Sequence, residues 1–187
     1  YVVMSDFNFD NETKDLNYND NTYLNLDMKN MGALVSTGGN ISLSCNSDKI
    51  NITNNNTQFS NIDIFDELTL EDAFLINVVE GIPNKEKVTF TLTIEHDGIV
   101  HSQDFNVTVY SPELVMTDFS GEEMEGNNNN IIDPGENAKF KFTIKNISLF
   151  PLDNIQAKLI SNDGYIRVIT DDLTIDHLDV NQSADIE

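Results

Sequence analysis

Two acidic residues in an asparagine-rich loop are the main candidates for metal chemistry. Asp133 and Glu136 follow the run Asn127–Asn130 and flank the pair Pro134-Gly135. Calcium takes oxygen ligands, and these carboxylates together with the loop carbonyls could supply several. Their spacing differs from the D-x-[DN]-x-[DN]-G loop with a distant bidentate glutamate. Two interpretations therefore stay open: a structural calcium site at Asp133 and Glu136, or a solvated acidic turn that needs no cofactor.

Cysteine and histidine give little basis for catalysis. Cys45 is the only cysteine, so it cannot form an internal disulfide, and its place at the end of the alternating segment Ile41–Cys45 predicts a small core residue. A catalytic thiol needs a base within hydrogen-bond reach, and no motif marks one. His96 and His101 flank a hairpin turn and are expected to meet across it, but two histidines without a third ligand are a weak metal signal. We expect no enzymatic activity.

Paired carboxylates and aromatic residues are further candidates. Glu122-Glu123 and Asp171-Asp172 are sequence neighbours in expected loops, which gives no reason to expect the converging carboxyl groups of a glycosidase. Tyr18, Tyr23 and Phe150 form either a sugar-stacking platform or ordinary packing contacts.

Composition excludes several classes of partner. The chain has 10 Lys+Arg against 32 Asp+Glu, a formal net charge of −22. This charge argues against nucleic acid as a partner and against docking on an anionic membrane surface. No apolar run approaches the roughly 20 residues of a membrane helix, so no membrane insertion is expected. Hydrophobic residues make up 39% of the chain, which is enough for a folded core. The first residue is Tyr1 instead of Met, which predicts an internal fragment or a processed chain.

The sequence contains an internal repeat, which indicates a duplicated domain. Three segments recur in the same order about 112 to 116 residues further along the chain: Val2–Phe7 as Leu114–Phe119, Asn21–Asn30 as Asn137–Asn146, and Ser47–Ile52 as Asp163–Val168. The join is expected at Tyr110-Ser111-Pro112, because proline ends a strand. We therefore assign residues 1–111 to a first domain and 112–187 to a second.

Each copy is expected to fold as β-strands. Apolar residues alternate with polar ones in Leu24–Met28 and in Phe140–Ile144, the pattern of half-buried strands. Further strands are expected in the first copy at Ile41–Cys45, Lys49–Thr53, Ala73–Val79, Lys87–Ile94 and Val100–Tyr110. Asp97-Gly98 suits a tight hairpin turn, and Glu67–Phe74 is the only segment expected to form a helical turn. About seven short strands in one copy favour an immunoglobulin-like β-sandwich.

The second copy lacks counterparts of the last three strands of the first. Half a sandwich leaves an apolar face and open sheet edges in water. The sequence therefore predicts an all-β chain of tandem immunoglobulin-like β-sandwiches, the second incomplete. Its missing strands are expected in the parent protein, in a partner chain, or in a region that was cut off or is disordered.

One motif resembles a known domain type. The loop Gly126–Glu136 contains I-x-P-G-E and leads into a strand that ends in Lys145-Asn146. It is similar to the immunoglobulin-like accessory domains of bacterial secreted surface proteins, such as those that follow the catalytic domain of gingipain-like cysteine peptidases. The first copy has Tyr18–Asn21 at this place and lacks the Pro-Gly turn. The catalytic cysteine and histidine of those peptidases have no counterpart here.

The resemblance implies a non-catalytic spacer or stabilising module of a larger exported bacterial protein, outside the cell or on its surface. Abundant asparagine with a single arginine, Arg167, is also typical of an AT-rich bacterial genome. The partners would be other domains of the same parent protein. The alternative is an adhesin or carbohydrate-binding module that contacts a host protein or glycan through exposed loops such as Gly121–Asn130.

Overall fold

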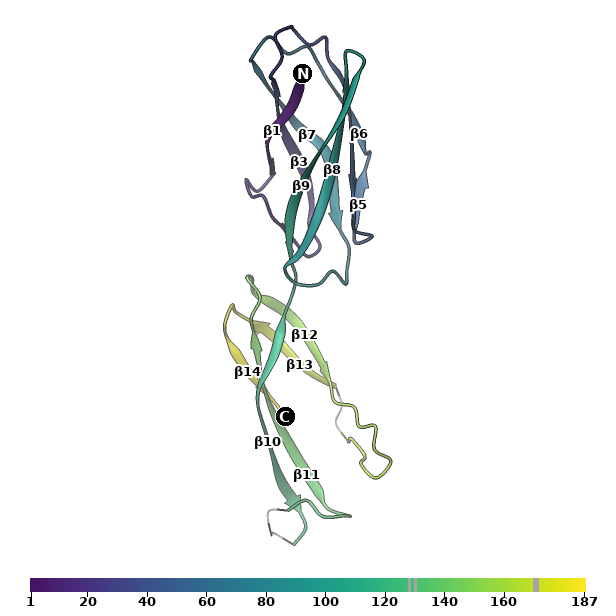
Figure 1. Ribbon diagram of the computed structural model, residues 1–187. Helices are drawn as coiled ribbons and strands as arrows, with labels where there is room; N and C mark the ends of the chain where they lie inside the picture. Colours follow the sequence, from purple (N-terminus) through teal and green to yellow (C-terminus); the bar gives the residue numbers. More distant parts are fainter. Residues whose placement is uncertain (128, 130, 170–171) are drawn as a thin grey trace. The chain divides into compact units, whose positions relative to one another are not determined.

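The computed structural model describes residues 1–127, 129, 131–169 and 172–187, and every regular element in this part of the chain is a β-strand (Figure 1). The chain divides into two compact units, Tyr1–Ser111 and Pro112–Glu187, called unit 1 and unit 2 below. The described residues include no helix long and apolar enough to cross a membrane.

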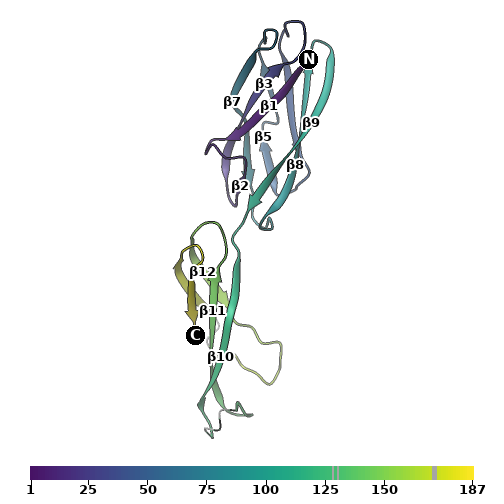
Figure 2. The ribbon, with the colours of Figure 1, turned by 60° about the vertical axis from the view of Figure 1, so that its left-hand side comes forward.

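Unit 1 is a sandwich of two sheets. The first sheet has the order β1 (Val2–Phe9), β3 (Asn21–Asn30), β7 (Glu67–Val78), β5 (Ile50–Thr53). The second sheet has the order β2 (Leu16–Asn17), β9 (Ile99–Tyr110), β8 (Glu86–His96), β4 (Gly39–Cys45), β6 (Asn56–Phe59). Figure 2 shows the layer of β1, β3 and β7 beside the layer of β8 and β9. The order β1-β3-β7-β5 against β9-β8-β4 is that of an immunoglobulin-like sandwich.

The core of unit 1 follows from the period of two in its strands. Leu24, Leu26 and Met28 on β3 are fully buried, because successive side chains of a strand point to opposite faces and these three point inward. They belong to one cluster with the inward residues of the opposite sheet, including Phe90 and Leu92 on β8. Burial of this apolar area is the main stabilising contribution to unit 1.

Of the two turns predicted in unit 1, the structure confirms the hairpin turn and contradicts the helical turn. The predicted turn at Asp97-Gly98 joins β8 to β9, with both residues in the left-handed region (φ 49° and 80°). The helical turn predicted at Glu67–Phe74 is wrong, because these residues lie in β7 and pair with β3. A register shift in this pairing, where Asp72 has a φ of 53°, changes which face each side chain occupies. The shift hides the alternation that identifies a strand.

Unit 2 repeats part of this arrangement. One sheet has the order β10 (Leu114–Glu125), β11 (Asn137–Asn146), β14 (Ser183–Ile186), and β12 (Leu152–Lys158) pairs with β13 (Asp172–Leu178). Phe142 pairs with Ile186, as Leu26 pairs with Leu70 in unit 1. Strands β10 to β14 therefore take the places of β1, β3, β4, β6 and the first part of β7.

Among the described residues, unit 2 has no strand in the places of β5, β8 and β9, so the chain consists of tandem immunoglobulin-like sandwiches of which the second is incomplete. In unit 1, β5 pairs with the second half of β7. The described residues of unit 2 contain no counterpart of that half. This explains why Asp163–Val168 is not a strand, although its sequence matches Ser47–Ile52.

Candidate functional site

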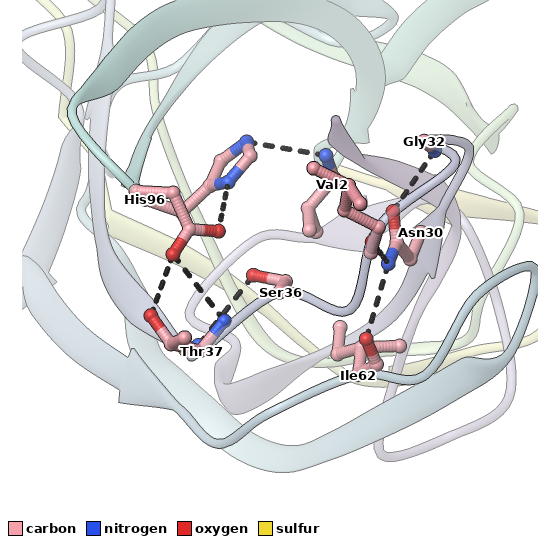
Figure 3. A network of polar contacts seen from close by, with 10 residues as sticks. Val2, Asn30, Gly32, Ser36, Thr37, Ile62 and His96 are labelled. Atoms are coloured by element: carbon pink, nitrogen blue, oxygen red, sulfur yellow. Dashed lines mark hydrogen bonds and ion pairs between the residues drawn. The ribbon is translucent and has the colours of Figure 1, made fainter.

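A polar cluster around the buried side chain of His96 lies where the β8–β9 hairpin meets the start of β1 (Figure 3). The backbone N–H of Val2 donates to Nε2 of His96 at 3.2 Å, and Nδ1 of His96 lies 3.2 Å from Oδ2 of Asp97. The side chain of His96 is only 1% exposed. Because Nε2 accepts the Val2 hydrogen bond, Nδ1 is the ring nitrogen that is placed to donate to Asp97.

Asp97 is held in the turn by a second residue. The Oγ1 hydroxyl of Thr37 donates to Oδ1 of Asp97 at 2.5 Å (Figure 3). Hydrogen bonds from Thr37 and then from His96 lower the pKa of Asp97 to about 2. The carboxylate is therefore ionised at neutral pH and fixes the orientation of the His96 ring.

His101 packs against the same cluster from β9. Its ring lies edge-on to the His96 ring, with the ring centres 5.9 Å apart, and the Tyr1 ring lies 4.6 Å away on a tilted plane. Burial, followed by the proximity of His96, lowers the pKa of His101. The two histidines thus meet across the hairpin as predicted. In the described part of the chain, no group of three or more His, Cys, Asp or Glu residues could hold a metal ion.

The pair Asp97–His96 has one feature of a general base and lacks another. A carboxylate that orients an imidazole is part of the catalytic triad, but the second ring nitrogen must reach the proton of a nucleophile. In this chain Nε2 of His96 accepts a hydrogen bond from the Val2 backbone instead. The contacts of the cluster therefore fasten the β8–β9 hairpin to β1 and to the turn at Thr37.

Asn30, at the end of β3, joins three segments of unit 1. Its fully buried side chain donates from Nδ2 to the carbonyls of Leu34 at 2.7 Å and Ile62 at 3.1 Å, and Oδ1 accepts from the N–H of Gly32 at 2.9 Å (Figure 3). Asn30 was not among the residues predicted to be structural. The available signal was the Lys-Asn pair that ends both repeated segments, at Asn30 and at Asn146.

The two predicted metal ligands lie together in the loop before β11. Oε2 of Glu136 accepts from the N–H of Asp133 at 2.9 Å, and Oε1 accepts from the N–H of Asn127 at 3.0 Å. The side-chain amides of Asn127 and Asn129 donate to Oδ2 of Asp133 at 3.0 and 3.1 Å. Among the described residues of the loop, hydrogen bonds thus reach three of the four carboxylate oxygens. Asn128 and Asn130, also expected to contribute carbonyls, lie outside the described residues. Both interpretations of this loop, a calcium site and a solvated acidic turn, stay predictions.

The remaining cysteine and histidine lie in different units. Cys45 is half-buried and packs beside the core of unit 1, and its thiol lies 3.4 Å from the carbonyl oxygen of Ser47. His177, on β13 of unit 2, lies between two carboxylates, with Nδ1 2.6 Å from Asp153 and Nε2 3.1 Å from Asp179. Hydrogen bonds to Asp153 and then Asp179 raise its pKa.

The paired carboxylates do not form a site. The loop predicted at Glu122-Glu123 is wrong, because both residues lie in β10 and pair with Lys139 and Ala138. Neighbours in a strand point to opposite faces, so the two carboxylates diverge. The strand continues through them because β10 and β11 form a long hairpin. Asp172 begins β13, and Asp171 lies outside the described residues.

The three aromatic candidates for sugar stacking are not brought together. Tyr18 and Tyr23 belong to unit 1 and Phe150 to unit 2. Tyr18 and Phe150 are half-buried, and Tyr23 is 39% exposed. Among the described residues, no ring contact joins any two of them.

Comparison with known proteins gives low similarities. No protein-family model and no curated protein matches the sequence. Among solved structures, the YadV chaperone is 7% identical with a TM-score of 0.34, and the match covers 98% of this chain and 83% of that one. The chaperone–tip adhesion subunit pre-assembly complex CsuC-CsuE, from archaic chaperone-usher Csu pili of Acinetobacter baumannii, is 8% identical with a TM-score of 0.28 over 98% and 90% of the chains. We assign the fold from the sheet order of the chain itself.

Proposed function

We propose that the chain is a non-catalytic spacer or stabilising module of a larger exported bacterial protein, such as a gingipain-like peptidase. The observation that supports this function most is the use of buried polar groups. The side chain of Asn30 joins the end of β3 to the connections at Leu34 and Ile62. The ring of His96 joins β8 to β1. Buried polar groups used in this way specify and rigidify a fold.

The surface charge fits an exported spacer. A net charge of −22 on 187 residues keeps neighbouring molecules apart and opposes nonspecific association with anionic polymers. In this proposal the module lies outside the cell or on its surface, and its partners are the other domains of the parent protein.

A replacement experiment tests the spacer role. In the natural protein, residues 1–187 are exchanged for an unrelated pair of immunoglobulin-like domains of similar length, and in a second variant they are deleted. A spacer or stabilising module predicts that deletion lowers secretion or protease resistance of the parent and that the exchange restores both. Loss of function in the exchanged protein, with normal secretion, would instead indicate specific recognition by this module.

The alternative is an adhesin or carbohydrate-binding module, and one feature of unit 1 favours it. A hollow of about 270 Å³ on the β1–β3–β7 sheet is lined by carboxylates and amides, including Asp10, Asn25 and Asp27. Such groups pair with sugar hydroxyls. A glycan and host-protein array with the wild-type chain and with Asn25→Ala distinguishes the two functions. Residues 121–125 of the loop predicted at Gly121–Asn130 lie in β10, so the loop tested is the connection between β10 and β11. Reproducible binding that Asn25→Ala or changes in this connection abolish would favour the adhesin.

A further inference from the structure

Two side chains of the second sheet of unit 1 hold the edge strand of the first sheet. β1 lies at the edge of the first sheet, and β8 and β9 belong to the second. The N–H of Val2 donates to Nε2 of His96 on β8 at 3.2 Å, and the N–H of Met4 donates to Oε1 of Gln103 on β9 at 2.8 Å. Nε2 of Gln103 also donates to the carbonyl of Met4 at 3.2 Å. These hydrogen bonds connect the two sheets beside the β8–β9 hairpin.

The two contacts differ in their response to protons. The amide of Gln103 does not titrate, whereas imidazole is the side chain whose ordinary pKa lies nearest to neutral pH. A neutral imidazole has one nitrogen that can accept a hydrogen bond, but a protonated imidazole has two N–H donors and no acceptor. A proton on Nε2 of His96 therefore removes the hydrogen bond from Val2 and places two N–H groups opposite each other (Figure 3).

Asp97 supplies a counter-charge for the protonated ring. The side chain of His96 is only 1% exposed, and burial disfavours a charge that has no partner. Nδ1 of His96 lies 3.2 Å from Oδ2 of Asp97, and the Thr37 hydroxyl holds the other carboxylate oxygen. Protonation of His96 turns this contact into an ion pair. The proton therefore costs the cluster the bond to Val2 and strengthens the one to Asp97.

His101 is a second titratable ring beside the same contact. Its ring centre lies 5.9 Å from that of His96 and 4.6 Å from that of Tyr1. Both ring nitrogens of His101 are buried, and neither has a hydrogen-bond partner in the part of the chain that the structure describes. A charge on His101 would lie next to the charged His96 ring without a counter-ion of its own. His96 is therefore the ring whose protonated form the cluster can accommodate.

Few other charged or titratable groups face the two rings. Asp97 faces them from the turn, and Tyr1 faces them through its ring and its amino group from the segment before β1. Thr37, from the connection after β3, does not titrate. Glu95 precedes His96 in β8 and is exposed, because neighbours in a strand point to opposite faces. The ammonium group of Lys29 on β3 forms an ion pair with a carboxylate of β7.

We propose that the hydrogen bond between Val2 and His96 is a pH-sensitive switch, closed at neutral pH and open in acid. Protonation of His96 releases the N–H of Val2 from the β8–β9 hairpin. Gln103 still holds Met4, so the opening is confined to the residues before Met4. Val2, which is fully buried in the closed form, becomes accessible to solvent. This inference goes beyond the proposed function, because a spacer does not need to respond to pH.

Amide exchange of the full chain, measured by NMR at about pH 7.5 and about pH 5, tests the switch. The chain carries a short Gly-Ser extension before Tyr1, so that a free amino group does not lie beside the His101 ring. Protection factors correct the rates for the pH dependence of intrinsic exchange. We expect the protection factor of the Val2 amide to fall about tenfold in acid. That of the Met4 amide, which Gln103 holds, stays unchanged and is the internal control.

Two further measurements separate protonation of His96 from other effects of acid. The nitrogen shifts of its imidazole report protonation directly, and the midpoint of this titration should coincide with that of the Val2 opening. In His96→Gln, the amide oxygen can accept the Val2 hydrogen bond and does not titrate, so the Val2 amide should stay protected at both pH values. The matched control is His177→Gln in unit 2, which should open like the wild type.

The outcomes are distinct. Loss of Val2 protection in acid that follows the titration of His96, with Met4 still protected, supports the switch. An unchanged Val2 amide overturns it, and so does an opening that follows the titration of His101 instead. An equal loss of protection at Val2, at Met4 and throughout β3 also overturns it, because unit 1 is then destabilised as a whole.

Discussion

Asn146 makes in unit 2 the hydrogen bonds that Asn30 makes in unit 1. Its Nδ2 donates at 3.0 Å to the carbonyls of Phe150 and Leu178, and its Oδ1 accepts from the N–H of Ser148 at 2.8 Å. For Asn30 the partners are Leu34, Ile62 and Gly32. Both asparagines are fully buried at the end of their strand. In both units, therefore, a buried asparagine side chain fixes the connection after this strand through the same pattern of hydrogen bonds.

Replacement of either asparagine should destabilise its own unit. Asn30→Ala leaves the carbonyls of Leu34 and Ile62 and the N–H of Gly32 without their side-chain partner, and we expect it to lower the free energy of unfolding of unit 1 by about 3 kcal/mol. Urea unfolding followed by circular dichroism measures the change. The exposed Asn51→Ala is the control and should change the value by less than about 0.5 kcal/mol. An equally small effect of Asn30→Ala would show that the network does not support the fold.

The sequence predicted the elements of the fold better than the roles of its polar residues. Alternation of apolar residues identified strands such as Leu24–Met28, because their buried face is regular. Glu67–Phe74 was misassigned because a bulge at Asp72 interrupts the pattern. Asp163–Val168 matches a strand of unit 1, but a strand also needs a partner, which sequence similarity alone does not reveal.

The candidate site depended more on contacts between distant residues. The meeting of His96 and His101 was predictable from the hairpin turn between them. The acceptor role of His96 was not, because Val2 lies 94 residues away in the sequence. The bonds of Asn30 to Leu34 and Ile62 likewise join separate connections, and only the repeated Lys-Asn pair indicated that the residue matters.

Asp97 should contribute to acid sensitivity of unit 1. Its folded-state pKa of about 2 lies below the ordinary value of 3.8, so its contribution to stability is present above pH 3.8 and is lost as the pH falls through about 2. We expect Asp97→Asn to lower the stability of unit 1 at pH 5 and to differ much less from the wild type near pH 2. Urea midpoints across this range measure the difference, with the exposed Asp48→Asn as control. A penalty for Asp97→Asn that is independent of pH would contradict this assignment.

His177 and His101 should titrate on opposite sides of the ordinary histidine pKa. Asp153 and Asp179 raise the pKa of His177, so its contribution to the stability of unit 2 is fully present below pH 6.5 and is lost as the pH rises through the raised value. Burial and His96 lower the pKa of His101, so unit 1 loses stability as the pH falls below 6.5. Proton NMR titration of the two imidazoles measures both, with His177→Gln assigning the resonance. The same pKa for both imidazoles would contradict the opposite shifts assigned to His177 and His101.

Glu136 should order the asparagine-rich loop without a metal. Its carboxylate accepts hydrogen bonds from the N–H groups of Asn127 and Asp133, so Glu136→Ala is expected to speed amide exchange in the loop before β11. Glu80→Ala, an exposed substitution in unit 1, is the control. Calcium and a chelator are expected to leave the melting temperature of the wild type unchanged. A rise in melting temperature with calcium, lost in Glu136→Ala, would establish the metal site instead.

The two units should unfold in separate transitions, and unit 2 first. Unit 1 buries side chains from both of its sheets, whereas the buried apolar residues of the second cluster are Ile175, Leu178 and Ile186, with half-buried neighbours around them. Because stability rises with the apolar area removed from water, we expect the transition at the lower temperature in calorimetry to belong to unit 2.

Phe90→Ala tests this assignment, because it removes a fully buried ring that stacks on Phe105. We expect it to lower the free energy of unfolding of unit 1 by about 3–5 kcal/mol and to leave the transition of unit 2 unchanged. The matching change in unit 2, Leu178→Ala, should lower only the first transition. A single transition that both substitutions shift equally would mean that the units unfold together.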